Sequence, residues 1–413
     1  MTSPTSLWRN RNYMLLWSGQ VVSTLGSSAS QIVYPLLILA LTSSPAAAGI
    51  AASVRALPYL LFSLPVGALV DRWNRRRVMI WADVGRALAV ASLPAALAFH
   101  ALSLAQIYAV CFVEGTLFVF FNLAEVATLS KVVPVAQFPQ ATAQNEAAFG
   151  AANILGPSLG AALFQAIGRG APFVANAISF VASAASVALL RGDLQPAEQA
   201  PRRKLSVEIT EGLRWMWNAP LVRTMAFLTG GLNLVGAATP LIVIVIGKHL
   251  GATAAQIGVI FSIEAVGGVI GSIIGGTIQR RFSFPQVILS AVWINAALFA
   301  LYGAASNVLV LGLIASLICT VGPIYNVVQF SYRLALIPNE LQGRVNSAFR
   351  LLAFGFNPIG AALSGWLLEY AGTGAAVAAF TLCCLGLALV ANLNRHVRQA
   401  RSFKQLASVP EPD

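Results

Sequence analysis

Charged side chains are scarce in this sequence. Of its 413 residues only 10% are Asp, Glu, Lys or Arg, whereas 57% are hydrophobic. A water-soluble protein of this length needs far more charge to cover its surface, so most of the surface must face a solvent other than water. The scarcity of charge therefore excludes a soluble globular protein and indicates a membrane protein.

Residue types for catalysis and metal binding are also few. The three histidines lie in predicted loops or in the C-terminal tail, and no H-E-x-x-H, Walker A or G-x-S-x-G motif on a suitable turn is present. The four cysteines lie inside apolar segments without zinc or redox spacing. We therefore expect no enzyme, no metal site and no cofactor.

Basic residues exceed acidic ones, giving a net charge of +12. The longest basic runs, 75–77 and 202–204, lie between apolar stretches and have no interleaved aromatic residues. Cytoplasmic loops of membrane proteins are enriched in Lys and Arg, which accounts for these runs. Nucleic acid is therefore not an expected partner; membrane lipids are.

Apolar stretches long enough to cross a bilayer recur along the chain. We predict twelve spans, at 14–41, 46–70, 78–99, 104–130, 140–166, 171–190, 219–247, 254–279, 284–305, 307–333, 342–370 and 374–394. The first is too long for a signal-peptide core and should be retained. The longest polar segment predicts a cytoplasmic linker over 191–218 with a short amphipathic helix at 207–217. The predicted domains are thus 1–190, the linker, 219–395 and a cytoplasmic tail, 396–413.

The distribution of Lys and Arg predicts the orientation. With the N-terminus inside, the outward connections hold only Arg169 and Lys248. We therefore predict a multi-pass inner-membrane protein with both termini in the cytoplasm.

An internal repeat divides the spans into two sets. Gly67-Ala-Leu-Val-Asp71-Arg72 ends the second span, and Gly275-Gly-Thr-Ile-Gln279-Arg280 ends the eighth. Gly160-Ala-Ala-Leu163 in the fifth span returns as Gly360-Ala-Ala-Leu363 in the eleventh. Parallel repeats of six spans are typical of one class of transporters, so we predict a small-molecule transporter.

The loop after the second span carries a recognisable motif. Gly67-Ala-Leu-Val-Asp71-Arg72-Trp73-Asn74-Arg75-Arg76-Arg77 resembles the signature loop of the major facilitator superfamily, with Asn74 where Gly is usual. Asn also tolerates the left-handed backbone. The resemblance implies an all-α membrane protein of twelve transmembrane helices in two six-helix bundles related by a pseudo-two-fold axis. We expect it to be a monomer.

The same resemblance implies a gate. Gly67 is expected to let two helices approach closely, and Asp71 to lie against the positive N-terminal end of the eleventh helix, near Arg344. Arg75 should then reach Glu125 low on the fourth helix. Arg72 and Arg76 belong to the same gating motif. The alternative is an ordinary positive-inside loop, and for Arg76 and Arg77 it is as good an explanation.

Two further patterns concern the direction of transport and the packing of the transmembrane helices. Ala152-x-x-x-Gly156-Pro157-x-x-Gly160-Ala161 resembles an exporter motif, although Ala replaces Gly at two positions. Small residues four apart also serve simple helix packing, which is the alternative. Gly267, Gly271 and Gly275 indicate packing only. More generally, the sequence resembles the branch of bacterial siderophore exporters and macrolide-efflux proteins.

Ionisable residues within spans are costly, about 2.5–3.5 kcal/mol or more at the helix centre, so each needs a reason. They are Arg55, Asp83, Arg86, Glu114, Glu125, Glu146, Glu264 and Arg350. Asp83 and Arg86 are three apart and favour a structural ion pair. Glu146 is expected to face the cavity or the cytoplasmic gate.

Glu114 and Glu264 lie near the middle of their spans. A carboxyl group at that depth can gain and lose a proton near neutral pH. Arg55 is the natural countercharge for one of them, and a permanent salt bridge is the alternative to a role in proton coupling. We expect at least one of the two to use the proton gradient.

These features favour a secondary active transporter, a proton-coupled exporter of a small amphiphilic compound such as a drug or siderophore. An importer or a lysolipid flippase on the same fold is the alternative, and a non-transporting receptor is the least favoured.

Overall fold

A computed structural model describes residues 7–70, 72–134, 137–192, 194, 205–338 and 341–400. These residues are almost entirely helical and contain no strand. Twelve helices are long and apolar enough to cross a membrane, and their bounds lie close to the twelve predicted spans. The prediction of an all-α membrane protein is therefore confirmed.

Several helices begin where the sequence supplies a capping side chain. Asn10, Ser103 and Asn307 precede the first, fourth and tenth spans, and each accepts a hydrogen bond from a backbone N–H three residues on. Such a bond satisfies one of the N–H groups that a helix start leaves unpaired. Asn74 caps the third span in the same way, with its side chain accepting from the N–H of Arg77.

The backbone of Asn74 does not have the left-handed conformation that the loop motif suggested for this position. Its backbone is extended, at φ −67° and ψ 105°, and is not left-handed. The side chain at this position therefore works as a helix cap.

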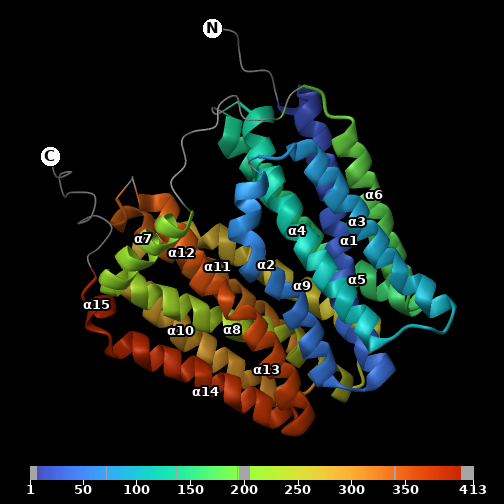
Figure 1. The fold of residues 1–413 in the computed structure, drawn as a ribbon. Helices are drawn as coiled ribbons and strands as arrows, with labels where there is room; N and C mark the ends of the chain where they lie inside the picture. Colours follow the sequence, from blue (N-terminus) through green and yellow to red (C-terminus); the bar gives the residue numbers. More distant parts are fainter. Residues whose placement is uncertain are drawn as a thin grey trace. The chain divides into compact units, whose positions relative to one another are not determined.

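The first compact unit comprises residues 1–199 with 252–262. Its spans are α1 (Arg11–Thr42), α2 (Pro45–Val70), α3 (Arg75–Ala98), α4 (Leu104–Val132), α5 (Phe138–Ala166) and α6 (Ala171–Ala188), preceded by the short helix η1 (Leu7–Arg9). Within it α1 packs on α5 and α6, α2 on α4, and α3 on α4 and α6. Figure 1 shows α1, α3 and α6 side by side. This arrangement brings the charges of α2, α3 and α4 into one bundle.

The second compact unit comprises 200–251 with 263–413. Its helices are α7 (Leu205–Asn218), α8 (Pro220–His249), α10 (Phe284–Ala300), η3 (Leu301–Ala304), α11 (Val308–Leu336), α12 (Gln342–Gly355), α13 (Asn357–Tyr370), α14 (Gly372–Leu393) and α15 (Arg395–Arg398), with most of α9 (Ala254–Arg281). Within it α8 packs on α12, α13 and α14, and α10 packs on α11 and α14. The predicted domain boundaries differ from these units chiefly at the start of α9.

The eleventh span is interrupted. α12 ends at Gly355 and α13 begins at Asn357, with Pro358 in the first turn of the second piece. Pro358 has no N–H to donate to the carbonyl of Phe354, so one hydrogen bond of the helical ladder is missing at this break.

Glycines of the repeat allow close helix contacts within each unit. A Cβ added at Gly160 would lie 2.0 Å from the carbonyl oxygen of Ala29 in α1, and one at Gly360 would lie 2.0 Å from that of Leu234 in α8. In α9, added Cβ atoms at Gly267 and Gly271 would meet backbone oxygens of α11 at 2.0 and 2.2 Å. The predicted packing role of the α9 glycines is confirmed at these two positions.

Candidate functional site

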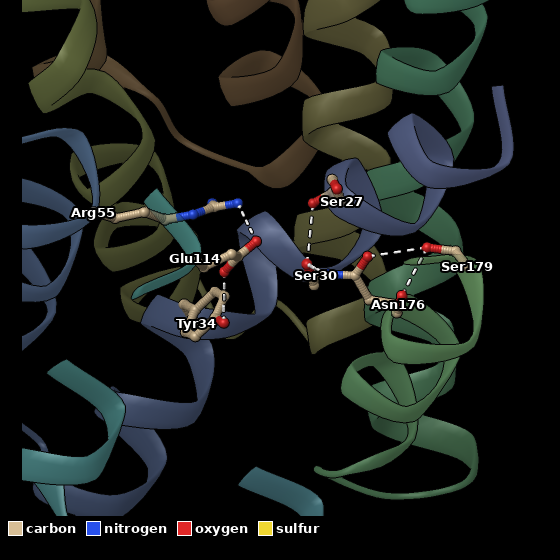
Figure 2. Close-up of polar contacts among 7 residues, drawn as sticks. All are labelled: Ser27, Ser30, Tyr34, Arg55, Glu114, Asn176 and Ser179. Atoms are coloured by element: carbon tan, nitrogen blue, oxygen red, sulfur yellow. Dashed lines mark hydrogen bonds and ion pairs between the residues drawn. The ribbon is translucent and has the colours of Figure 1, made fainter. Parts of the chain in front are cut away.

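The first unit contains a buried charged cluster made by three helices. Arg55 of α2 donates a hydrogen bond to one oxygen of Glu114 in α4 at 2.9 Å, and the Tyr34 hydroxyl of α1 donates to the other at 2.8 Å. Figure 2 shows the two donors approaching the carboxylate from different sides. Glu114 and Tyr34 are buried, and the Arg55 side chain is 25% exposed. Both oxygens of this carboxylate are therefore satisfied.

Close helix packing brings the cluster together. A Cβ added at Gly115 would lie only 2.3 Å from the carbonyl oxygen of Arg55, so α2 and α4 approach closely beside the ion pair. The Tyr34 ring packs edge-on against Phe173 at a centroid distance of 5.0 Å, and the Arg55 guanidinium lies 5.5 Å from the Tyr34 centroid. The arginine therefore gains both a carboxylate and an aromatic partner.

A polar network ties α1 to α6 nearby (Figure 2). The Asn176 amide donates to the Ser30 hydroxyl at 2.8 Å, and Ser30 donates to the carbonyl of Ser27 at 3.1 Å. Ser179 donates to the side-chain oxygen of Asn176 at 3.2 Å and to its carbonyl at 2.7 Å. Ser30 and Asn176 are fully buried. Such satisfied buried networks fix the relative position of two helices.

The carboxylate of Glu264 in α9 has a different environment. Its Oε2 is buried without a hydrogen-bond partner, and among the described residues no Lys or Arg pairs with it. Its titratable neighbours are Tyr302 of η3 and Cys319 of α11, and the Tyr302 hydroxyl is likewise buried without a partner. Arg55 therefore pairs with Glu114, and Glu264 has no countercharge among the residues that the structure describes.

The gating loop is described only in part, since Asp71 lies outside the described residues. Arg72 is exposed. Arg75 is buried and donates to the carbonyls of Ala127, at 3.0 Å, and Leu194, at 3.4 Å. It therefore reaches the end of α4 that carries Glu125, while the charged neighbours of Glu125 are Asp83 and Arg86. The latch between Arg75 and Glu125 stays a prediction.

Gly67 makes no close contact with the described helices of the first unit, and its role in the gate stays a prediction. A Cβ added there would meet no atom of the described chain within 4 Å. The close contact between α2 and its neighbour lies three turns away, at Gly115 of α4. Proximity of two helices depends on where they cross, which a glycine within a motif does not reveal.

Arg344 lies in the first turn of α12, but its observed partner is in the linker helix. It donates to Glu211 of α7 at 2.7 Å, and a Cβ added at Gly212 would lie 2.5 Å from the Arg344 carbonyl oxygen. α7 thus packs closely on α12, as Figure 1 also shows. α7 covers the segment 207–217, in which the sequence predicts a short amphipathic helix.

Asp83 and Arg86 form an ion pair deep in the first unit. The guanidinium also lies 4.2 Å from the Phe180 centroid and 4.9 Å from that of Phe121. Both charged side chains are buried between α3, α4 and α6. These contacts favour a structural role for the pair.

Glu146 and Arg350 lie within spans but have exposed side chains, so neither is a buried charge; that Glu146 faces the cavity or the cytoplasmic gate stays a prediction. In α5 the buried residues Ala152, Gly156 and Gly160 follow one another at four-residue spacing, and Glu146 lies on another face. In α12 Phe349 is buried and the next residue, Arg350, is turned outward by about 100°. Position within a span does not determine which face of the helix a residue occupies.

The exporter-like segment packs against α1. Added Cβ atoms at Gly156 and Gly160 would come within 2.5 Å of Ser28 and 2.0 Å of Ala29. Pro157 lies between them inside the unbroken helix α5. Packing therefore accounts for both glycines, and their bearing on transport direction stays a prediction.

Arg333 is a buried charge that the sequence analysis did not identify. It is buried in the last turn of α11, with its guanidinium 3.6 Å from the Phe349 centroid and 5.3 Å from that of Phe330. Because it lies at the end of its predicted span, it was indistinguishable from the boundary arginines. Among the described residues no group of His, Cys, Asp and Glu can hold a metal ion.

Comparisons with known proteins place these features in a family. The family described as transmembrane secretion effector matches residues 2–413. The multidrug efflux pump Tap of Mycolicibacterium fortuitum is 27% identical, with 96% of this chain and 98% of the relative covered. Macrolide efflux protein A of Streptococcus pyogenes is 26% identical over 45% of each chain.

Solved structures show the same fold at low identity. The nucleoside transporter NupG superposes with a TM-score of 0.76 at 12% identity, covering 97% of this chain and 100% of that one. A bacterial homologue of the iron transporter ferroportin, in an inward-facing state, gives 0.70 at 16% identity, covering 93% and 100%. With twelve apolar spans, a major facilitator fold and a match over nearly its whole length, the chain belongs to the transmembrane secretion effector family of major facilitator transporters.

Proposed function

We propose that this transporter exports a small amphiphilic compound in exchange for protons, by alternating access, and that Glu264 carries the proton. The observation that carries the proposal is the environment of this carboxylate, buried at Oε2 without a cation or hydrogen-bond donor among the described residues. A buried charge without a partner is costly, whereas the protonated carboxyl is not. Accepting a proton here therefore relieves an energetic cost.

Glu114 is the weaker candidate for the same role. Its two oxygens accept hydrogen bonds from Arg55 and Tyr34, so its ionised form is already stabilised. Protonation would remove the partner of a largely buried guanidinium. We infer that Arg55, Glu114 and Tyr34 hold α1, α2 and α4 together during transport.

The direction and substrate class rest on relatives. Tap is named a multidrug efflux pump, and a second relative is named for macrolide efflux. Multidrug substrates are typically apolar molecules with a polar or charged part, which agrees with a membrane-embedded path holding few charges. We propose export from the cytoplasm across the inner membrane, with both termini inside, by a monomer.

Inverted membrane vesicles test this function. An imposed proton gradient, acid inside, should drive accumulation of a macrolide or a fluorescent amphiphilic cation by the wild-type protein. Glu264→Gln should abolish the gradient-driven part, whereas Glu369→Gln, at an exposed glutamate of α13, should leave it intact. Equal gradient-driven uptake by Glu264→Gln and wild type would refute the role of Glu264.

Other outcomes would favour the alternatives. Accumulation only in right-side-out vesicles would favour import, and movement of lysophospholipid between leaflets without drug uptake would favour a flippase. The topology is tested separately by C-terminal fusions to alkaline phosphatase and green fluorescent protein. Fluorescence without phosphatase activity is expected.

A further inference from the structure

A groove of about 470 Å³ lies between α3 and α4 of the first unit. Its wall is largely aromatic and aliphatic and includes Trp73, Trp81, Leu117 and Phe120. Trp73 and Phe120 are stacked, with centroids 6.2 Å apart and ring planes 8° apart, and Trp81 is 72% exposed. The volume falls in the range of small-molecule binding sites, about 300–1,000 Å³.

One cationic side chain, that of Arg77, lines this groove. It belongs to the first turn of α3 and is exposed. The two preceding arginines are engaged elsewhere, Arg75 with the carbonyls of Ala127 and Leu194 and Arg76 with that of Ala188. Among the described residues no side chain pairs with the guanidinium of Arg77. The groove therefore offers one available positive charge beside an apolar wall.

The groove lies where a transmembrane helix meets the membrane surface. α3 begins at Arg75, and Trp81 is six residues further, about 9 Å along the helix axis. Tryptophans and arginines at this depth contact the interface between headgroups and acyl chains. A ligand that fits has an apolar part for the aromatic wall and an anionic group for Arg77.

We propose that this groove binds one anionic phospholipid, taken from the leaflet next to the α2–α3 loop, which is cytoplasmic in the predicted orientation. The phosphate and anionic headgroup lie at Arg77, and an acyl chain lies between Trp73, Trp81 and Phe120. Basic pockets between transmembrane helices on the cytoplasmic side select anionic headgroups by the same charge complementarity. The inference does not depend on the transported substrate or on coupling to protons.

Native mass spectrometry tests the proposal on the full-length protein, which is first delipidated in detergent and then mixed with one phospholipid at a time. Phosphatidylglycerol should be retained in preference to phosphatidylcholine of the same chain length. Arg77→Gln should lower phosphatidylglycerol retention about fivefold and leave phosphatidylcholine nearly unchanged, since one arginine near an anionic surface contributes roughly that factor. Trp81→Ala removes part of the apolar wall and should lower the retention of both lipids.

Controls separate this site from general attraction to lipid. Arg281→Gln changes an exposed arginine at the end of α9 and should not alter retention of either lipid. Thermal unfolding of each variant checks that it is folded. Equal retention of the two lipids by the native protein, or the same loss from Arg281→Gln as from Arg77→Gln, would overturn the proposal.

Discussion

Gly160 of α5 lies directly against the carbonyl oxygen of Ala29 in α1, where an added Cβ would be only 2.0 Å away. Cβ atoms essentially never come closer than 3.0 Å to another heavy atom, so any side chain here must push the two helices apart. Gly360 has the same relationship to Leu234 in the other unit. The sequence repeat thus produces an equivalent contact between two helices in each of the two units.

Gly160→Ala and Gly360→Ala should each destabilise the protein. Overpacking of this kind typically costs about 1–3 kcal/mol. The measurement is thermal unfolding in detergent, followed by loss of the monodisperse peak in size-exclusion chromatography. Gly386→Ala is the matched control, because a Cβ on that residue of α14 meets no atom within 4 Å. It should leave stability equal or slightly higher, since Ala favours helix over Gly. An unchanged unfolding temperature for Gly160→Ala would contradict the close contact.

Glu114→Gln should be strongly destabilising. It removes the charge that compensates Arg55, and breaking a buried ion pair costs about 3–5 kcal/mol, less here because the Arg55 side chain is 25% exposed. The double variant Arg55→Leu/Glu114→Leu should be more stable than the sum of the losses from Arg55→Leu and Glu114→Leu predicts. A double-mutant cycle of these two single variants and the double variant measures the difference. Strictly additive losses in that cycle would show that the two side chains are not coupled.

Glu264→Gln, in contrast, should leave the unfolding temperature nearly unchanged. The carboxylate has no ionic partner in the described chain, so the neutral amide leaves no charge uncompensated. Comparison with Glu114→Gln in the same detergent checks the difference between a paired and an unpaired glutamate. A large loss of stability from Glu264→Gln would indicate a stabilising contact of its carboxylate.

Asp71→Asn should cripple transport while the protein remains inserted. The loop motif implies that this carboxylate holds the gate through the positive end of a helix, and the amide lacks the charge for that interaction. Efflux from loaded cells and the amount of protein in membranes should be measured together. Wild-type transport in this variant would remove the latch.

Glu211→Gln should have a small effect on global stability, within about 1 kcal/mol, because its ion pair with Arg344 is partly exposed. Its local effect should be larger, since the pair helps to fix α7 on α12. Limited proteolysis should cleave the 191–218 linker faster in the variant than in the native protein. Arg214→Gln, elsewhere on α7, is the control and should not change the rate.

Much of the fold could be predicted because its signals are local. A run of about 20 apolar residues specifies a span wherever it lies, so the twelve predicted spans agree with the structure to within a few residues. The helix break in the eleventh span was not predicted, although Pro358 marks it. Partners of charged residues could not be predicted in the same way, because they lie 59 positions apart for Arg55 and Glu114 and 133 for Arg344 and Glu211.

The sequence by itself determined that the chain is a twelve-span transporter, because hydropathy, repeated motifs and a signature loop need no knowledge of contacts. Only the tertiary structure determines the surroundings of each of several identical residues. Arg75, Arg76 and Arg77 are identical and adjacent, yet the first is buried against α4, the second donates to the end of α6, and the third lines a groove. Each successive residue on a helix turns by about 100°, so neighbours in sequence face different surroundings.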